Sequence, residues 1–133
     1  MIKEAIQHYK QSHGYSQFSP RCVLFDMDGV LYNSMPNHAV AWHEAMKQFD
    51  IHFTADDSYA TEGARGVDTI RKYVLEQQGK EISGEEAQRM YDVKTEIFHR
   101  MPIAEIFPGV IDIMQKIKSA GMTIGVVTGS GQR

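Results

Sequence analysis

Apolar residues recur at helical spacing near the start of the chain and then run together in a short block. The helical spacing predicts a short helix over residues 2–11, followed by a polar, turn-rich linker over residues 12–20. Residues 22–25 form a continuous apolar run, which is typical of a strand covered on both faces. The apolar face of the first helix consists of Ile2, Ala5, Ile6 and Tyr9.

The pattern becomes helical again after Ser34 and stays helical for most of the chain. Pro36 suits the first turn of a helix, and Gly79 suits the residue that follows one. Ser83 and Glu86 have the spacing of a capping box, which predicts a helix start between them. The helices predicted in this region span residues 36–49, 55–62, 67–78 and 84–100.

The last part of the chain predicts one more helix and a second strand. Pro108 and Gly109 open the helix, Gly121 closes it, and residues 123–127 form an apolar strand. Without the helical insert, the order is strand, helix, parallel strand, which is one βαβ unit of an α/β fold. We therefore expect a partial Rossmann-like core of two parallel strands with an inserted α-helical cap. The expected division is an N-terminal helix and linker over 1–20, the core over 21–34 and 103–133, and the cap over 35–102.

Composition narrows the class of protein without naming an activity. The chain has 133 residues and a net charge of −3, and it has no basic cluster, so nucleic acid is not an expected partner. No apolar run is long enough to cross a membrane, so a membrane is not an expected partner either. The chain has one cysteine, Cys22, which points to a reducing cytoplasm and predicts a buried, inert thiol.

Polar residues follow both predicted strands at the point where each ends. Asp26 and Asp28 come after the first strand, and Thr128, Gly129 and Ser130 come after the second. The carboxyl ends of parallel strands lie at one edge of a sheet, where open α/β sheets bind ligands. An Asp-x-Asp-Gly stretch alone is also compatible with an exposed turn. The small, hydroxyl-rich second loop favours a phosphate site.

The stretches FDMDGVL and VVTGSG resemble the haloacid dehalogenase superfamily, in its subgroup with an α-helical cap after the first strand. The resemblance covers residues 21–133, and the first twenty residues have no counterpart that we assign from sequence. It implies that Asp26 attacks phosphorus and becomes an aspartyl phosphate, while Asp28 acts as general acid and base. It also implies that Thr128 bonds the phosphoryl group, aided by the backbone N–H groups of Gly129 and Ser130.

The resemblance further implies a Mg²⁺ cofactor and a small phosphorylated metabolite as substrate. Asp26 would bind the metal through its side chain and Asp28 through its backbone carbonyl. An aspartate at position 28 favours phosphate-ester chemistry over dehalogenation, because it protonates an alkoxide leaving group. We expect a phosphatase, with a sugar phosphomutase of the β-phosphoglucomutase type as the alternative. The GARG segment departs from the cap loop of the mutases.

Residues of the cap supply further candidates. Arg65 falls in the loop that, in the resembling subgroup, selects the substrate, and a solvated loop arginine is the alternative. His38 matches a histidine common in such caps, although a surface histidine is also possible. Trp42 is expected in the cap core. Asn33 and Ser34 are candidate hinge residues where the chain enters the cap.

Other function classes fit the sequence less well. A metalloprotease helix would need a histidine four residues after His43, and Lys47 stands there. Gly129-Ser130-Gly131 could begin a dinucleotide-binding loop, and a non-catalytic module of the same fold is a further alternative. The resembling enzymes add a lysine and an acidic pair after the second motif. We therefore expect this chain to be a piece of a longer enzyme, nearly inert alone, with core strands that lack a full sheet to bury them.

Overall fold

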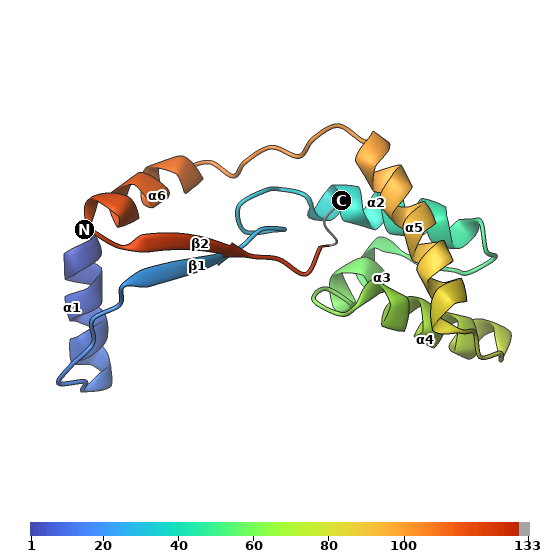
Figure 1. The fold of residues 1–133 in the computed structure, drawn as a ribbon, viewed down its shortest axis with the longest axis horizontal. Coiled ribbons are helices and arrows are strands. Elements are labelled where there is room, and N and C mark those ends of the chain that lie inside the picture. The colour runs from blue at the N-terminus through green and yellow to red at the C-terminus, as the bar shows by residue number, and fades with distance from the viewer. Residues whose placement is uncertain (131–133) are drawn as a thin grey trace. The chain divides into compact units, whose positions relative to one another are not determined.

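A computed structural model describes residues 1–130, which divide into two compact units (Figure 1). The sheet unit comprises Met1–Tyr32 and Ile106–Thr128; the cap unit comprises Asn33–Glu105, with Gly129 and Ser130 grouped with it. The elements of the sheet unit are α1 (Ile2–His13), β1 (Cys22–Asp26), α6 (Val110–Ser119) and β2 (Thr123–Val127). The elements of the cap unit are α2 (Met35–Lys47), α3 (Ala55–Ala60), α4 (Gly66–Gln78) and α5 (Gly84–Arg100).

The two strands pair in parallel, as the sequence predicts. Their register runs from Cys22 opposite Thr123 to Asp26 opposite Val127. The connection between them passes through the cap unit and then through α6, which precedes β2. The fold is therefore α/β, with two parallel strands and a helical insert, and both strands end at the same edge of the sheet.

The burial of these strands differs from the buried-strand expectation. Exposed and partly buried residues alternate along β1, and Leu24 is 66% exposed, while Val126 and Val127 on β2 are also exposed. Each strand has one neighbour in the described part of the chain, so much of the sheet surface faces solvent. Cys22 was expected to be buried, and that expectation is wrong. It is exposed, because it begins β1, which has one neighbouring strand in the described part of the chain. The expectation that the core strands lack cover is confirmed.

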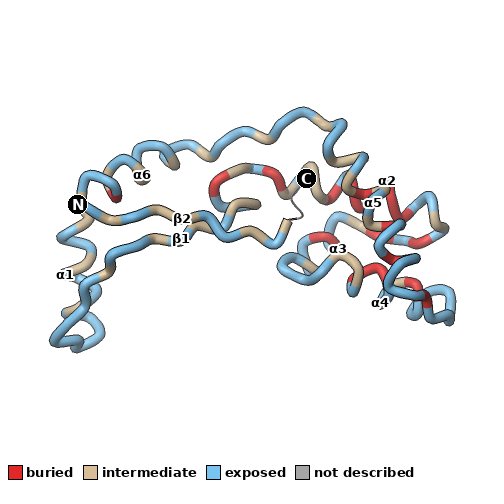
Figure 2. Tube along the Cα trace, in the orientation of Figure 1, coloured by how far each residue is buried: buried red, intermediate tan, exposed pale blue. Residues whose placement is uncertain are grey.

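The cap unit holds most of the buried residues (Figure 2), and most of these are apolar. Helices α2, α4 and α5 each turn an apolar stripe inward, as their 3.6-residue spacing predicts. Trp42 is buried as expected, with its ring centroid 5.3 Å from that of Phe53. The core consists of Trp42, Met46, Ile51, Phe53, Ile70, Val74, Ile82, Ala87 and Met90.

The helix ends of the cap follow local sequence signals. Gly79 ends α4 with a left-handed φ of 67°, and the Ser83 hydroxyl accepts a hydrogen bond from the Glu86 N–H at 3.1 Å. A complete capping box between Thr54 and Asp57 starts α3. None of the described helices has the length and apolar character needed to cross a membrane.

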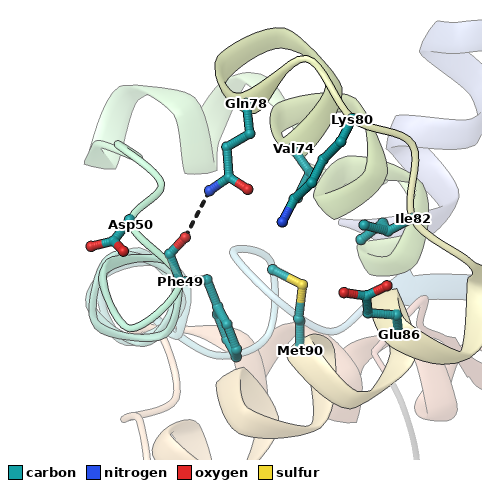
Figure 3. A pocket seen from close by; sticks show the side chains of 8 residues that line it. All are labelled: Phe49, Asp50, Val74, Gln78, Lys80, Ile82, Glu86 and Met90. Carbon is teal, nitrogen blue, oxygen red and sulfur yellow. Dashed lines mark hydrogen bonds between the residues drawn. The ribbon is translucent and has the colours of Figure 1, made fainter.

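A small hollow opens at one side of the cap core (Figure 3). Its volume is about 130 Å³, and Gln78 Nε2 closes one wall by donating to the Phe49 carbonyl oxygen at 2.9 Å. The Met90 and Lys80 side chains point into it. None of the predicted site residues lines the hollow, and all of the residues that line it belong to the cap unit. It is lined by Phe49, Asp50, Val74, Gln78, Lys80, Ile82, Glu86 and Met90.

Candidate active site

A tight loop follows β1 and fixes the backbone around Asp28. The Met27 carbonyl oxygen accepts from the Leu31 N–H at 3.0 Å and from the Tyr32 N–H at 3.1 Å. The Gly29 N–H donates to the Tyr32 carbonyl oxygen at 2.9 Å, which closes the turn. The φ of Gly29 is 73°, a left-handed conformation that suits glycine. Leu31, in the same loop, is buried. The sequence Met27-Asp28-Gly29 is therefore held as a closed turn at the end of a strand.

Asp26 and Thr128 lie at the same edge of the sheet. Asp26 ends β1 opposite Val127, and Thr128 follows Val127 directly. The Asp26 carboxylate is exposed, and its Oδ1 accepts from the Met27 N–H at 2.7 Å, which orients the group. The structure thus brings Asp26, Asp28 and Thr128 to the carboxyl end of one strand pair, where ligands bind in open α/β sheets.

The rest of the predicted phosphate loop is only partly described. Gly129 is exposed and Ser130 is half-buried, and both are grouped with the cap unit. Gly131, the third residue of the Gly-Ser-Gly stretch, lies outside the described residues. The contact of Gly129 and Ser130 with phosphate therefore stays a prediction.

The oxygen atoms at this edge suit a hard cation only in part. In the described part of the chain, no group of three or more histidine, cysteine, aspartate or glutamate side chains could hold a metal ion. Mg²⁺ is commonly held by one or two carboxylates together with water and substrate phosphate. Asp26 and Asp28 fit that pattern, because they supply carboxylate and carbonyl oxygens beside the predicted phosphate position.

His38 sits in an aromatic and cationic cluster that the sequence did not predict. Lys94 on α5 is only 4% exposed, and its Nζ lies 2.8 Å from His38 Nδ1. An ammonium group only donates, so His38 Nδ1 accepts when Lys94 is charged. The ring of His38 stacks on Phe98 at 4.1 Å, and Trp42 and Phe98 rings lie 5.4 Å and 5.1 Å from the lysine nitrogen.

The signal for Lys94 was present in the sequence. Ala87, Met90 and Lys94 are buried at positions i, i+3 and i+7 of α5, so the lysine occupies an inward position of an apolar stripe. A lysine at such a position is expensive to bury unless other groups stabilise its charge. His38 is therefore half-buried and oriented by its neighbours rather than a solvated surface histidine.

Arg65 lies in the loop between α3 and α4, as predicted, and immediately precedes α4. Its side chain is 83% exposed and pairs with Asp68 at 3.9 Å, a surface ion pair of little energetic weight. The following residue, Gly66, lies against the ring of Tyr91, where a Cβ atom would clash. The backbone at Arg65 is thus closely fitted to α5, while the guanidinium reaches into solvent.

The predicted hinge residues lie where the two units meet along the chain. The unit boundary falls between Tyr32 and Asn33, and the Asn33 N–H donates to the Glu105 carbonyl at 2.8 Å. Ser34 is almost fully buried and starts α2 as its N-cap. Asn33 and Ser34 therefore stay candidates for a hinge.

The chain has a parallel strand pair with two aspartates at its carboxyl edge, and a helical cap is inserted after the first strand. This combination defines a class of hydrolase. Residues 23–133 match the haloacid dehalogenase-like hydrolase family, and the chain belongs to that family. Its relatives include a phosphatase and a phosphomutase, so the chain comes from an enzyme family of that kind.

The chain spans about half the length of the relatives that it matches. A phosphoglycolate phosphatase of Mannheimia succiniciproducens is 25% identical over 89% of the chain and 54% of its own length. A beta-phosphoglucomutase of Bacillus subtilis is 22% identical over 83% and 51%. A solved structure from Bacteroides vulgatus, assigned as a beta-phosphoglucomutase, is 45% identical, with a TM-score of 0.83 over 98% of this chain and 54% of that one.

That last match supplies a counterpart for the N-terminus, which the sequence left unassigned. It covers 98% of the chain, so it includes most of the first twenty residues, for which the sequence alone suggested no counterpart. Helix α1 and the linker are therefore shared with a protein of the same fold. The sequence motifs could not show this, because the first of them begins at Phe25.

Proposed function

We propose that the protein carrying this chain is a Mg²⁺-dependent phosphatase of a small phosphorylated metabolite. The observation that supports this most strongly is the placement of Asp26, the closed turn at Asp28 and Thr128 at one sheet edge. Two carboxylates beside a hydroxyl-bearing loop suit transfer of a phosphoryl group better than any other chemistry weighed from the sequence.

In the proposed reaction, each aspartate has a separate task. A carboxylate oxygen of Asp26 attacks phosphorus, the bond from phosphorus to the ester oxygen breaks, and Asp28 donates a proton to that leaving oxygen. Asp28 then takes a proton from water as the water attacks the aspartyl phosphate, which releases phosphate and restores Asp26. Thr128 donates a hydrogen bond to the phosphoryl oxygens.

The metal belongs to the same edge. Bound Mg²⁺ would offset the repulsion between a carboxylate and a phosphate dianion. Asp26 would hold it through the side chain and Asp28 through the backbone carbonyl. The hydrogen bond from the Met27 N–H to Asp26 Oδ1 supports this assignment, because it limits how the carboxylate can turn.

Two residues of the cap complete the proposal. Arg65 carries an exposed cation on a closely fitted backbone, which suits recognition of an anionic substrate. His38 is oriented by Lys94 and Phe98, with Nδ1 beside the Lys94 ammonium and Nε2 buried, so a hydrogen bond from His38 would require a substrate oxygen to enter the cap. We propose that both contact the part of the substrate remote from the reacting phosphate.

The test is phosphate release by the natural protein that contains this chain, measured on a panel of small phosphate monoesters. We expect turnover that requires Mg²⁺ and falls by at least about 10³-fold in Asp26→Asn, since the nucleophile is lost. Thr123→Ser, a strand residue at the opposite end of β2, serves as the folded control. Full activity in the presence of EDTA, or in Asp26→Asn, would reject the proposal.

A sugar phosphomutase is the second candidate, favoured by the 45% identity to the Bacteroides vulgatus structure. Both activities share the attack by Asp26 and differ in whether water or a second sugar hydroxyl accepts the phosphoryl group. The natural protein would be given β-glucose 1-phosphate with a bisphosphate primer. Isomerisation faster than phosphate release would favour the mutase, and the reverse would favour the phosphatase.

A further inference from the structure

Asp57 joins helices α3 and α4 through its side chain. Its Oδ1 accepts from the Tyr73 hydroxyl on α4 at 2.8 Å. Its Oδ2 accepts from the Thr54 N–H and from the Thr54 hydroxyl, both at 2.7 Å. The carboxylate therefore fixes the start of α3 against the middle of α4.

The main chain of the same residue holds the loop that carries Arg65. The Asp57 carbonyl oxygen accepts from the Thr61 N–H at 3.0 Å and from the Thr61 hydroxyl at 2.8 Å. The Ala64 N–H then donates to the Thr61 carbonyl at 3.0 Å. A continuous series of hydrogen bonds thus leads from Tyr73 through Asp57 and Thr61 to Ala64, the residue before Arg65.

The Arg65 carbonyl oxygen accepts from the Thr69 N–H of α4 at 3.0 Å, but the side chain of Arg65 has little to set its position. Its side chain is solvent-exposed, and its ion pair with Asp68 is long. The loop from Thr61 to Arg65 must therefore be ordered through its backbone. Gly66 against Tyr91 fixes the far end of the loop, and the bonds at Asp57 fix the near end.

We propose that Asp57 and Tyr73 are positioning residues for Arg65, which hold the loop 61–65 in the one conformation that presents the guanidinium to the substrate. This inference rests on the proposed function of Arg65 as a substrate contact. A group held in place before binding loses less conformational freedom on binding, so loosening the loop weakens substrate binding more than it slows the chemical step.

The variant Tyr73→Phe tests the inference with little change in packing. It keeps the ring, whose centroid lies 4.8 Å from that of Phe53, and removes only the hydroxyl. Tyr59→Phe, on the exposed side of α3, is the matched control. In the 133-residue chain, we expect amide hydrogen exchange at Thr61 and Ala64 to become at least about tenfold faster, with a clearly smaller increase at Ile70 and Val74, which reflects the loss of overall cap stability.

Kinetics of the natural protein supply the second measurement. Tyr73→Phe should raise KM by about five- to tenfold and change kcat by less than about twofold. Arg65→Gln should raise KM as well, and the double variant should be no worse than Arg65→Gln alone, because Tyr73 would act through Arg65. Asp57→Asn should behave as Tyr73→Phe does.

The outcomes separate this inference from the proposed function. Additive increases in KM, or exchange that rises equally throughout the cap, would overturn the positioning of Arg65. If the natural protein turns over no phosphate ester, the proposed function fails and the substrate part of the inference fails with it. The exchange measurement still decides whether the Asp57–Tyr73 pair orders the loop.

Discussion

The cap unit and the sheet unit differ in how well the described residues bury their apolar side chains. All of the buried apolar residues in the described chain except Leu31 and Ile117 belong to the cap unit. The cap packs helices α2, α4 and α5 around one core, whereas the residues of the two strands are exposed or partly buried (Figure 2), among them apolar residues of both strands. The chemistry proposed here lies on the less buried unit, so stability and activity should respond to different residues.

The largest contrast is expected between a core residue of the cap and an apolar residue of the sheet. Phe53 is 1% exposed, so Phe53→Ala should lower the free energy of unfolding of the cap by about 3–5 kcal/mol. Leu24 is 66% exposed, so Leu24→Ala should change it by about 0.5 kcal/mol or less. Urea unfolding of the 133-residue chain, followed by circular dichroism, measures both values.

The fluorescence of Trp42, the one tryptophan of the chain, reports the cap separately. A loss at Leu24→Ala as large as at Phe53→Ala would show that the strands are covered in solution and would remove the contrast. Equal, small losses at both positions would show that the cap core is not the main source of stability.

Helical periodicity predicted most of the cap, because a buried stripe repeats every 3.6 residues whatever else the chain contains. The predicted helix 84–100 coincides with α5, and the predicted strand 123–127 coincides with β2. Strand burial was wrong for β1, because an apolar run indicates what a strand can bury and not which neighbours are present. The Lys94–His38 contact escaped prediction, because it joins residues far apart in sequence and places a charge in an apolar stripe.

The candidate site, like the fold, was predictable from the sequence in part. Parallel pairing follows from the order of elements, so Asp26 and Thr128 were expected at one edge, and the register confirms that. The bonds around Asp57 were not expected, since α3 spans only Ala55–Ala60 and offers little periodicity. The contacts of the cap residues with substrate remain predictions.

Substitutions at two glycines should show the same contrast between the units, with a smaller loss of unfolding free energy than Phe53→Ala. At Gly66, a Cβ would clash with the Tyr91 ring, which packs against the core, so Gly66→Ala should cost about 1–3 kcal/mol. At Gly125 on β2, the Cβ would lie 2.7 Å from Leu24 Cδ2, the end of an exposed, flexible side chain that can turn away. Gly125→Ala should therefore cost little.

Gly84 provides the matched control for the cap glycine. It begins α5 as Gly66 begins α4, and no atom lies within 4 Å of a Cβ placed there. Gly84→Ala should leave the free energy of unfolding unchanged or raise it slightly. If Gly66→Ala is as well tolerated as Gly84→Ala, then the fit between α4 and α5 is looser than the structure indicates.

The smallest effect concerns the pH dependence of cap stability. Hydrogen bonds from the Thr54 backbone and hydroxyl hold the pKa of Asp57 below its usual range, and burial together with the bond to Asp57 raises the pKa of Tyr73 to about 12. As pH rises from about 10 to about 12, an unfolded tyrosine loses its proton first, so the cap loses stability in that window. As pH falls below about 4, an unfolded aspartate gains its proton first, so stability falls there too.

Tyr73→Phe should separate these two losses. It should cost about 1 kcal/mol at neutral pH, remove the loss between about pH 10 and 12, and keep most of the loss in acid, where the Thr54 bonds act. Asp57→Asn should instead remove the acid loss. Urea unfolding followed by Trp42 fluorescence across this pH range measures both, with Tyr59→Phe as the control. An alkaline loss in Tyr73→Phe equal to that of the parent chain would show that another group titrates with unfolding of the cap.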